Sequence, residues 1–480
     1  MGRFKSLRGY VRFLKKRGEL LEYDEPVDVR YELSAVTKRY DGEKTILFKN
    51  VRGYSIPVLT NLFCKRDRFS DVLQVPTELV VETIVERAKK PIETELVDSG
   101  PVKDRVYRGG FDLQDMLPIP THHEKDAGPY ITSGVIIAKD PDTGVRNASY
   151  ARMQVKGPRK LGIMINRWRH LWQLYAKAER RGEPLEVAIV IGGPPELIIE
   201  GAMPGNIVPI TQDELDTAGG LVGRPLKVVE CETVDLEVPA NSEIVLEGRI
   251  PPGVREEEGP FGDYSMVYDG IVRRRLEPVI ELTCLSMREN PIYHDILPAS
   301  MDHWILGGIP REAELLDTVR RVNPNVLKVH LTPGGCCRFH AVVQIRKTCE
   351  ADGKTTIVAA YSPTETARDV KLVVVVDEDI DPFNLAEVEW ALATRVQYDR
   401  DIVVLRDQPG SLDPSAIAST PEPVLMGEGG TEKVILCAKL GVDATRTFRN
   451  PKLLPLFERI KVAGGDVFGR SEDSRNPSRA

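Results

Sequence analysis

The sequence lacks the features that mark membrane, disulfide-rich or nucleic-acid-binding proteins. It has no apolar run long enough to cross a bilayer and no CxxC pair, and only Cys336 and Cys337 of its seven cysteines are adjacent. Reduced thiols and the absence of a secretion signal predict a cytoplasmic protein. The net charge of -7 contains no long block of one sign, which argues against nucleic acid or an anionic membrane as a partner.

The composition is that of an ordinary globular protein in which charged residues are somewhat enriched. Hydrophobic residues make up 41% and charged residues 29% of the 480 residues, and this length predicts two to four domains. The alternation of helical and strand patterns along the chain predicts a multidomain protein of the α+β or α/β class.

Three regions differ in their patterns. Residues 1–105 predict an N-terminal α/β segment that begins with an amphipathic helix. Residues 106–305 hold repeated short apolar runs bounded by Gly or Pro, with one obvious helix near 167–180, and predict a sheet-rich barrel or sandwich. Residues 306–480 return to a βαβ-like alternation, which predicts a C-terminal α/β domain with a disordered tail.

The strongest local pattern is an acidic string, Glu256-Glu257-Glu258-Gly259-Pro260-Phe261-Gly262-Asp263-Tyr264. Glycine and proline between carboxylates predict an irregular turn, which can hold Glu258 and Asp263 on one side of a cavity. Two carboxyl groups that share a site can divide into one ionised and one protonated group. The string by itself leaves open that it is only an acidic turn on an exposed loop.

A second group of candidate residues lies upstream. Residues 146–153 predict a strand, in which Asn147 and Arg152 would face opposite sides unless a bulge or a strand end intervenes. Asn147, His170 and Glu214 together would form an oxygen-rich ligand set suited to Mn²⁺ or Mg²⁺. No short spacing shows that the three meet, and a packed core histidine and a solvated glutamate are the alternatives.

These motifs, in this order, resemble the UbiD family of decarboxylases. Agreement runs from about residue 100 to 450. The matching elements are Asn147-x-x-x-x-Arg152, His170, Glu214, the segment Pro239-Ala240-Asn241-Ser242-Glu243-Ile244-Val245-Leu246-Glu247-Gly248, the Glu258 to Asp263 string, and Lys439-Leu440-Gly441-Val442-Asp443-Ala444-Thr445. The resemblance implies an N-terminal α/β segment, a split β-barrel of flavin-reductase type that binds prenylated FMN, and a C-terminal α/β oligomerisation domain. It also implies a homodimer or a dimer-based hexamer.

The resemblance further implies a cofactor site with a metal. Asn147, His170 and Glu214 would bind Mn²⁺ or Mg²⁺ that anchors the cofactor phosphate, and Lys439 would reach the same phosphate. Main-chain carbonyls near Ala148 and at residues 201–203 could hold K⁺. The remaining cofactor-binding residues would be Ser149, Tyr150, Ala151 and Arg152.

Arg152, Glu258 and Asp263 would form the catalytic acid-base network. In the family the prenylated flavin serves as the electron sink for loss of CO2, and a carboxylic acid then protonates the product. Asp263 stands where many relatives have Glu, one methylene longer, which leaves open which carboxyl group delivers the proton. A flavin prenyltransferase would supply the cofactor.

The substrate is a small carboxylic acid whose identity is less closely determined. The charge-rich composition and the short Asp263 favour trans-anhydromevalonate 5-phosphate, which would give isopentenyl phosphate and CO2 in the archaeal mevalonate pathway. Arg167, Arg169 and Arg338 are candidate partners for its phosphate. An aromatic, heteroaromatic or polyprenyl-hydroxybenzoate acid is the alternative. A flavin-dependent oxidoreductase, which would not need the acidic network, and a non-catalytic flavin-binding protein are the alternatives from other classes.

Overall fold

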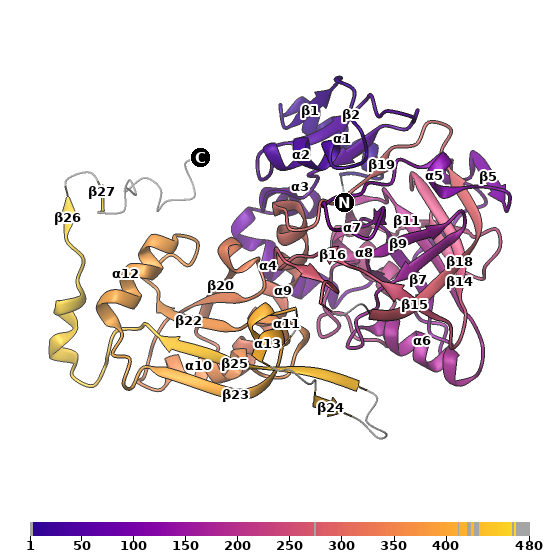
Figure 1. Ribbon diagram of the computed structural model, residues 1–480. Coiled ribbons are helices and arrows are strands. Elements are labelled where there is room, and N and C mark those ends of the chain that lie inside the picture. The colour runs from indigo at the N-terminus through magenta and orange to yellow at the C-terminus, as the bar shows by residue number, and fades with distance from the viewer. Residues whose placement is uncertain are drawn as a thin grey trace. The chain divides into compact units, whose positions relative to one another are not determined.

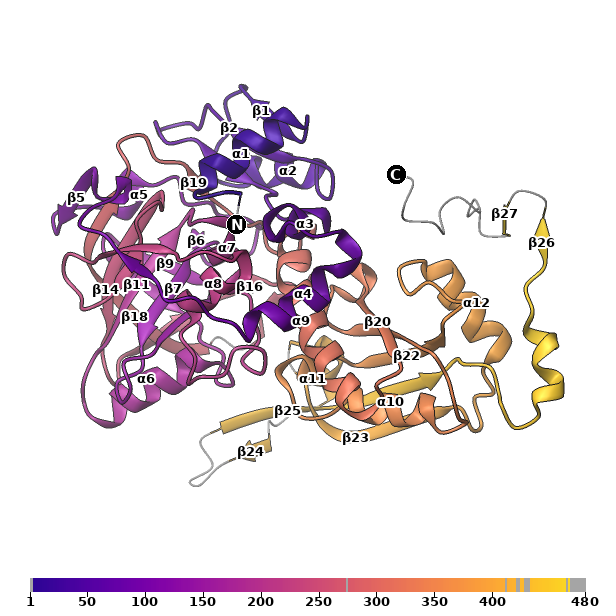
Figure 2. The same cartoon turned by 180° about the vertical axis from the view of Figure 1, so that it is seen from behind.

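The computed structural model describes residues 3–272, 275–410, 412–419, 424–426, 432–462 and 465–466. The chain divides into two compact units, Met1–Ala313 and Glu314–Ala480, with the boundary inside helix α9 (Met301–Val322). Helices and sheets occur in both units (Figures 1 and 2), which confirms the predicted multidomain α/β class. The predicted disordered tail lies outside the described residues. The boundaries after residues 105 and 305 stay a prediction.

The first unit begins with a small sheet and its helices. The strand order is β1-β2-β3-β19, so β19, from the far end of this unit's sequence, pairs with β3. Helix α1 begins after Ser6, whose hydroxyl accepts a hydrogen bond from the amide of Gly9. The elements are α1 (Leu7–Lys16), β1 (Leu20–Tyr23), α2 (Glu32–Arg39), β2 (Thr45–Phe48), β3 (Val58–Thr60), α3 (Asp67–Leu73), α4 (Val80–Ala88) and β19 (Tyr293–His294).

A ten-stranded sheet forms the middle of the first unit. Its order is β6-β9-β10-β18-β14-β11-β7-β8, with β5 and β15 also paired to β18. Its strands are β5 (Arg105–Arg108), β6 (Tyr130–Ile131), β7 (Val135–Lys139), β8 (Arg146–Tyr150), β9 (Met153–Gly157), β10 (Lys160–Ile163), β11 (Leu185–Ile191), β14 (Ile244–Ile250), β15 (Arg255–Glu258) and β18 (Arg275–Met287). Within the described residues no pairing joins β6 to β8, so the sheet is not a closed barrel there.

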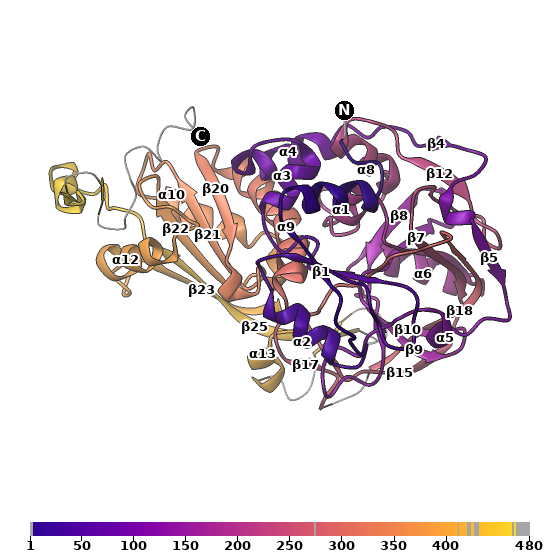
Figure 3. The ribbon, with the colours of Figure 1, turned by 90° about the horizontal axis from the view of Figure 1, so that it is seen from above.

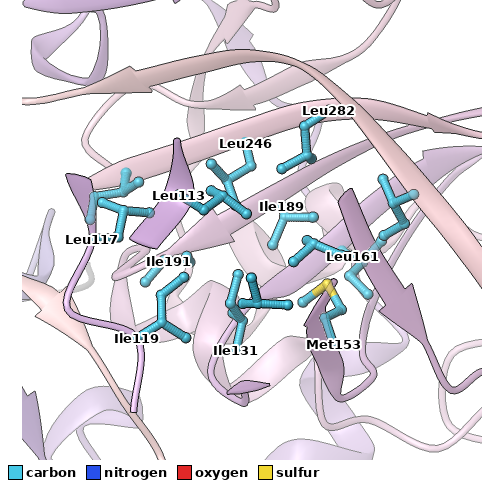
Figure 4. Close-up of a cluster of buried hydrophobic side chains, with 14 of the residues drawn as sticks. Leu113, Leu117, Ile119, Ile131, Met153, Leu161, Ile189, Ile191, Leu246 and Leu282 are labelled. Atoms are coloured by element: carbon cyan, nitrogen blue, oxygen red, sulfur yellow. The ribbon is translucent and has the colours of Figure 1, made fainter. Parts of the chain in front are cut away.

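Strand β11 is buried on both faces of this sheet. Ile189 and Ile191 belong to one apolar cluster, which Figure 4 shows together with Leu246 and Met153. Ala188 and Val190 belong to a second cluster, which also holds side chains of helices α7 and α8. The continuous apolar run of β11 is typical of a strand that is covered on both sides.

Helices α7 (Pro195–Glu200) and α8 (Glu214–Val222) show that the prediction of a single obvious helix in this region is wrong. The predicted helix is α6 (His170–Arg180). Glycines lower the helix propensity of α8. A β-carbon at Gly220 would lie 2.4 Å from the carbonyl oxygen of Lys90, so the close packing requires glycine there. Helix α8 also packs against α4 (Figure 3).

Smaller elements complete the first unit. Strands β4 (Glu95–Leu96), β12 (Lys227–Glu230) and β13 (Glu237–Pro239) form a three-stranded sheet. Strands β16 (Phe261–Gly262) and β17 (Tyr268–Asp269) form a hairpin, and the short helix α5 (Leu113–Met116) lies between β5 and β6 in the sequence.

The second unit has a six-stranded mixed sheet, which confirms the predicted βαβ-like alternation. Strand order is β20-β21-β22-β25-β23, with β24 paired to β25, and β21, β22 and β25 run parallel. Its elements are β20 (Val326–Leu331), β21 (His340–Ile345), α10 (Asp352–Ala360), α11 (Glu365–Asp369), β22 (Leu372–Asp377), α12 (Leu385–Arg395), β23 (Ile402–Gly410), α13 (Pro414–Ser419), β24 (Val424–Met426), β25 (Glu432–Asp443), β26 (Lys461–Val462) and β27 (Gly465–Asp466). In the described part of the chain no helix combines the length and apolar character of a membrane span. The structure describes all seven cysteines and joins none of them in a disulfide.

Candidate active site

The acidic string forms the irregular turn that the sequence predicts. Strand β15 ends at Glu258, and Gly259 follows with a φ of +87°, a backbone conformation that favours glycine. The hairpin of β16 and β17 then returns the chain, so that Phe261 pairs with Asp269. This return brings Asp263 and Asp269 to the same place as Glu258.

Arg152 joins the three carboxylates. It lies between the end of β8 and the start of β9, so a strand end does intervene between Asn147 and Arg152. Its Nε and one terminal nitrogen donate to Glu258 at 3.0 and 2.8 Å, and its Nη1 donates to Asp263 at 2.6 Å. Its Nη2 also donates to Asp269 at 2.8 Å. The structure therefore brings the predicted catalytic residues together around one guanidinium.

Burial makes this cluster electrostatically strong. Burial alone would lower the pKa of Arg152, but the carboxylates of Glu258 and Asp263 hold that pKa well above its usual range. Burial also acts to raise the pKa of Asp269, and the charges of Arg152 and Arg275 outweigh it and lower that pKa. The side chain of Glu258 is 0% exposed and that of Asp263 is 11% exposed, so Asp263 is the more accessible acid.

Sequence reasoning missed three members of this cluster. Asp269 is one, and Arg275 donates to it from Nε at 3.0 Å. The hydroxyl of Tyr130 donates to Glu258 at 3.1 Å, and burial followed by the Glu258 charge raises the pKa of that hydroxyl. Asp269 ends β17 and Gly270 follows it with a φ of +74°, so the Asp269-Gly270 pair could have pointed to the end of this strand but not to the register that places Asp269 here.

The predicted metal ligands also meet. Glu214, the first residue of α8, accepts hydrogen bonds from Asn147 Nδ2 at 2.7 Å and from the amide of Ala148 at 2.5 Å. His170, the first residue of α6, places Nδ1 3.3 Å from Glu214 Oε1. A β-carbon at Gly205 would lie 2.7 Å from His170 Nε2, so glycine leaves room for the imidazole ring.

This second cluster is acidic, and among the described residues no arginine or lysine is paired with Glu214 or Glu200. Burial raises the pKa of Glu214, against the hydrogen bonds from His170 and Ala148. Glu200, at the end of α7, is 0% exposed, and among the described residues neither of its carboxylate oxygens has a hydrogen-bond partner. Burial and then the charge of Glu214 raise the pKa of Glu200 well above its usual range. Two buried acids with this donor set fit a bound cation.

The other predicted site residues lie as follows. Ser149 donates to Asn147 Oδ1 at 3.2 Å, and the hydroxyl of Tyr150 donates to the carbonyl of Ile198 at 3.3 Å. Ala151 follows β8, next to Arg152. Lys439 lies in the second unit, where its ammonium donates to the carbonyls of residues 367, 368 and 370. Its predicted contact with a cofactor phosphate stays a prediction. Within the described ranges, no group of three or more His, Cys, Asp and Glu side chains is arranged to hold a metal. The predicted metal site therefore needs the amide of Asn147 as a ligand beside His170 and Glu214.

Three family models match successive parts of the chain. Residues 11–88, 95–301 and 304–444 match the N-terminal, Rift-related and C-terminal domains of 3-octaprenyl-4-hydroxybenzoate carboxy-lyase, UbiD. The anhydromevalonate phosphate decarboxylase of Methanothermobacter thermautotrophicus is 41% identical over 434 residues, covering 90% of this chain and 96% of that protein. The chain belongs to the UbiD family of carboxy-lyases.

Solved structures agree with this family assignment. The UbiD-class enzyme HmfF from Pelotomaculum thermopropionicum, in complex with FMN, is 44% identical with a TM-score of 0.87, over 96% of this chain and 98% of that one. An evolved dimeric form of HmfF in complex with prFMN is 42% identical with a TM-score of 0.85, over 98% of this chain and 100% of that one. The family recognised from the motifs is therefore confirmed.

Proposed function

We propose that this UbiD-family chain is a prenylated-FMN-dependent decarboxylase that converts trans-anhydromevalonate 5-phosphate to isopentenyl phosphate and CO2. The Arg152 cluster is the observation that supports decarboxylation. It holds buried acids beside a fixed cation, and a decarboxylase needs such an acid to protonate the product carbon. The substrate rests on the 41% identity to an anhydromevalonate phosphate decarboxylase over 90% of the chain.

The two clusters lie at the two ends of one short segment, which limits the distance between them. Asn147 and Arg152 are five residues apart, at most about 16 Å for extended backbone. A ligand with a phosphate at one end and a reactive ring at the other can therefore reach both clusters. Ser149, Tyr150 and Ala151 lie between the two and would line the cofactor. We infer that the ten-stranded sheet, with β8 in it, is the split-barrel domain of the family.

Asn147, His170 and Glu214 would hold a divalent metal, Mn²⁺ or Mg²⁺, that binds the cofactor phosphate. The amide of Asn147 can present its oxygen instead of its nitrogen, because these two atoms exchange places by a flip. The carboxylate of Glu200, which has no hydrogen-bond partner in the described part of the chain, supports a further cation, K⁺, beside this site. The carbonyl of Gly201, one of those predicted to hold K⁺, accepts from the amide of Tyr150 at 3.3 Å.

The protein's own residues would divide the proton chemistry among them. Prenylated FMN supplies the electron sink when it is bound. Arg152 orients Glu258 with two hydrogen bonds and Asp263 with one, and Glu258 is closed off from solvent. We infer that Asp263, the more exposed acid, delivers the proton that replaces the departing CO2.

Of the three predicted phosphate partners, Arg167 is the best supported. Its charge acts on Glu277, which also lies within the fields of Glu258 and Arg152. Its guanidinium stacks over Trp172 at 5.0 Å. Arg169 donates to the carbonyl of Met203 at 3.5 Å, and Arg338 pairs with Asp369 in the second unit.

The test uses the full chain co-expressed with a flavin prenyltransferase and loaded with Mn²⁺. We expect release of CO2 and isopentenyl phosphate from trans-anhydromevalonate 5-phosphate, and little turnover when the protein carries unmodified FMN. Turnover of aromatic or heteroaromatic acids alone would keep the reaction type and overturn the substrate. NAD(P)H oxidation without CO2 release would favour an oxidoreductase instead. We also infer a cytoplasmic homodimer or dimer-based hexamer, which the dimeric form of HmfF supports and light scattering would test.

A further inference from the structure

Asp269 is bound on two sides by arginines. Its Oδ2 accepts from Arg152 Nη2 at 2.8 Å and from Arg275 Nε at 3.0 Å, and its Oδ1 accepts from Arg275 Nη2 at 3.2 Å. The nitrogen of Arg152 that bonds Asp269 also bonds Glu258. Asp269 therefore holds Nη2 of Arg152, whereas Asp263 accepts from Nη1.

The charges of this cluster do not balance. Two guanidiniums, of Arg152 and Arg275, face three carboxylates, so full ionisation leaves one negative charge in excess in a largely buried place. The side chains of Arg152 and Asp269 are each 7% exposed, and that of Arg275 is 36% exposed. A buried excess charge is costly, and binding one proton removes it. Against its burial, the charges of Arg152 and Arg275 lower the pKa of Asp269, so Asp269 is ionised.

We propose that Asp269 is a positioning residue that fixes Arg152 and whose negative charge retains one proton among the carboxyl groups around Arg152. This inference rests on the proposed decarboxylase only for its kinetic readout. Without Asp269, the remaining charges would balance with every carboxyl group ionised, and the acid would lose its proton at a lower pH.

Other titratable and charged groups surround the cluster from every packed element. Glu277 lies on β18 and burial raises its pKa to about 7, so it is the main competing site for a proton. His123 lies against Gly262, and Asp126 accepts from the amide of Gly262 at 2.8 Å. The described groups are Tyr130 on β6, His123, Lys125 and Asp126 in the preceding loop, Glu258 on β15, Asp263, Tyr268 and Asp269 in the β16–β17 hairpin, Arg275 and Glu277 on β18, Arg152 after β8, and Arg167 before α6.

The kinetic test compares two substitutions of opposite charge. We would measure kcat/KM against pH for the holoenzyme, for Asp269→Asn, for Arg275→Gln and for the double variant. Asp269→Asn should move the alkaline limb about one pH unit or more to lower pH. Arg275→Gln should move it to higher pH by less, because Arg275 is more exposed, and the double variant should return it toward the wild type. A merely structural role would lower the rate at all pH values and leave the limb in place.

Two controls separate the alternatives. The same series in a Glu277→Gln background should keep the opposite shifts, and their disappearance would assign the proton to Glu277 and overturn the proposal. Asp142→Asn, an equal charge change at an exposed pair with Lys177 and Arg181, should leave the limb unchanged.

A second readout does not need turnover. In the cofactor-free protein, the infrared difference spectrum between the wild type and Asp269→Asn should show one protonated carboxyl band at neutral pH, because the variant loses that proton at a lower pH. The buried acids Glu200 and Glu214 are the same in both proteins, so their signals cancel in this difference. The same signal at the same pH in both proteins would overturn the proposal. If no acid is decarboxylated but the infrared shift is found, the proposed function fails and the role of Asp269 stands.

Discussion

The two buried polar clusters of the first unit lie at opposite ends of the same short segment, residues 147–152, yet their buried carboxylates have different partners. Around Arg152, carboxylates are paired with a cation that the chain itself supplies. Around Glu214, the donors are an amide, an imidazole and a backbone N–H, and Glu200 has no hydrogen-bond partner in the described structure.

The two clusters therefore differ in where positive charge comes from: Arg152 supplies it to the carboxylates around it, whereas the described neighbours of Glu214 supply hydrogen bonds. A buried carboxylate without a cation is costly, whereas one with a bidentate arginine is stabilised. The Arg152 cluster can therefore keep its geometry in the cofactor-free protein. Burial raises the pKa values of the acids in the Glu214 cluster, and we propose that a bound metal offsets their charge when they are ionised.

The largest expected effect is at Asp263. Asp263→Asn should keep flavin, metal and substrate binding but lower turnover by about 10²- to 10⁴-fold, the range of a lost general acid. It should also slow deuterium incorporation from D2O into the product. Quench-flow kinetics and mass spectrometry of the product would measure both.

Glu258→Gln is the matched comparison. It removes the partner of two Arg152 nitrogens, so it should disturb the whole network and resemble Arg152→Ala. Near wild-type turnover of Asp263→Asn would assign the proton to another group and remove the distinction drawn between the two acids.

The metal ligands should show the next largest effect. His170→Ala should lose most bound Mn²⁺ and flavin together on gel filtration, because a missing ligand weakens the bridge to the cofactor phosphate. Ser149→Ala, which removes only a hydrogen bond to Asn147, should weaken metal binding by about tenfold. Metal analysis and flavin absorbance of the same fractions would test this order. Wild-type occupancy in His170→Ala would show that the metal site lies elsewhere.

The sequence predicted the centres of both clusters but not their surroundings. Glu258 and Asp263 are separated by Gly and Pro, and the local turn alone brings them near each other. Asp269 depends on the register of a hairpin, and Arg275 on the pairing of β15 with β18, which are tertiary facts. Helix α8 was hidden because Gly219 and Gly220 lower helix propensity, and only their close packing explains them.

Glu200 was missed for a similar reason. It ends an apolar run, Leu197-Ile198-Ile199-Glu200, in which an acid could equally mark a solvated helix end. Only the packing of α7 against α8 shows that this acid is buried beside Glu214.

The smallest expected effect is on stability, and it tests whether the Glu214 cluster binds a cation. Because the pKa of Glu200 is raised in the folded state, its ionisation lowers the free energy of unfolding. This loss of stability is absent below the pKa of Glu200 in the unfolded chain and grows as pH rises above about 4.5. Glu200→Gln should therefore stabilise the metal-free protein by about 2 kcal/mol at pH 7 and by little at pH 4.5. Glu196→Gln is the comparison, because Glu196 is buried in the same helix but pairs with Arg224 at 2.5 Å. Burial raises the pKa of Glu196 too, but the charge of Arg224 opposes that shift and Glu196→Gln leaves Arg224 without this partner, so this substitution should stabilise the fold less at pH 7 than Glu200→Gln. Urea unfolding of the metal-free proteins at both pH values would measure the difference, and Mn²⁺ and K⁺ should then stabilise the wild type more than Glu200→Gln. An equal response of the two proteins to these cations would show that Glu200 does not face a cation site.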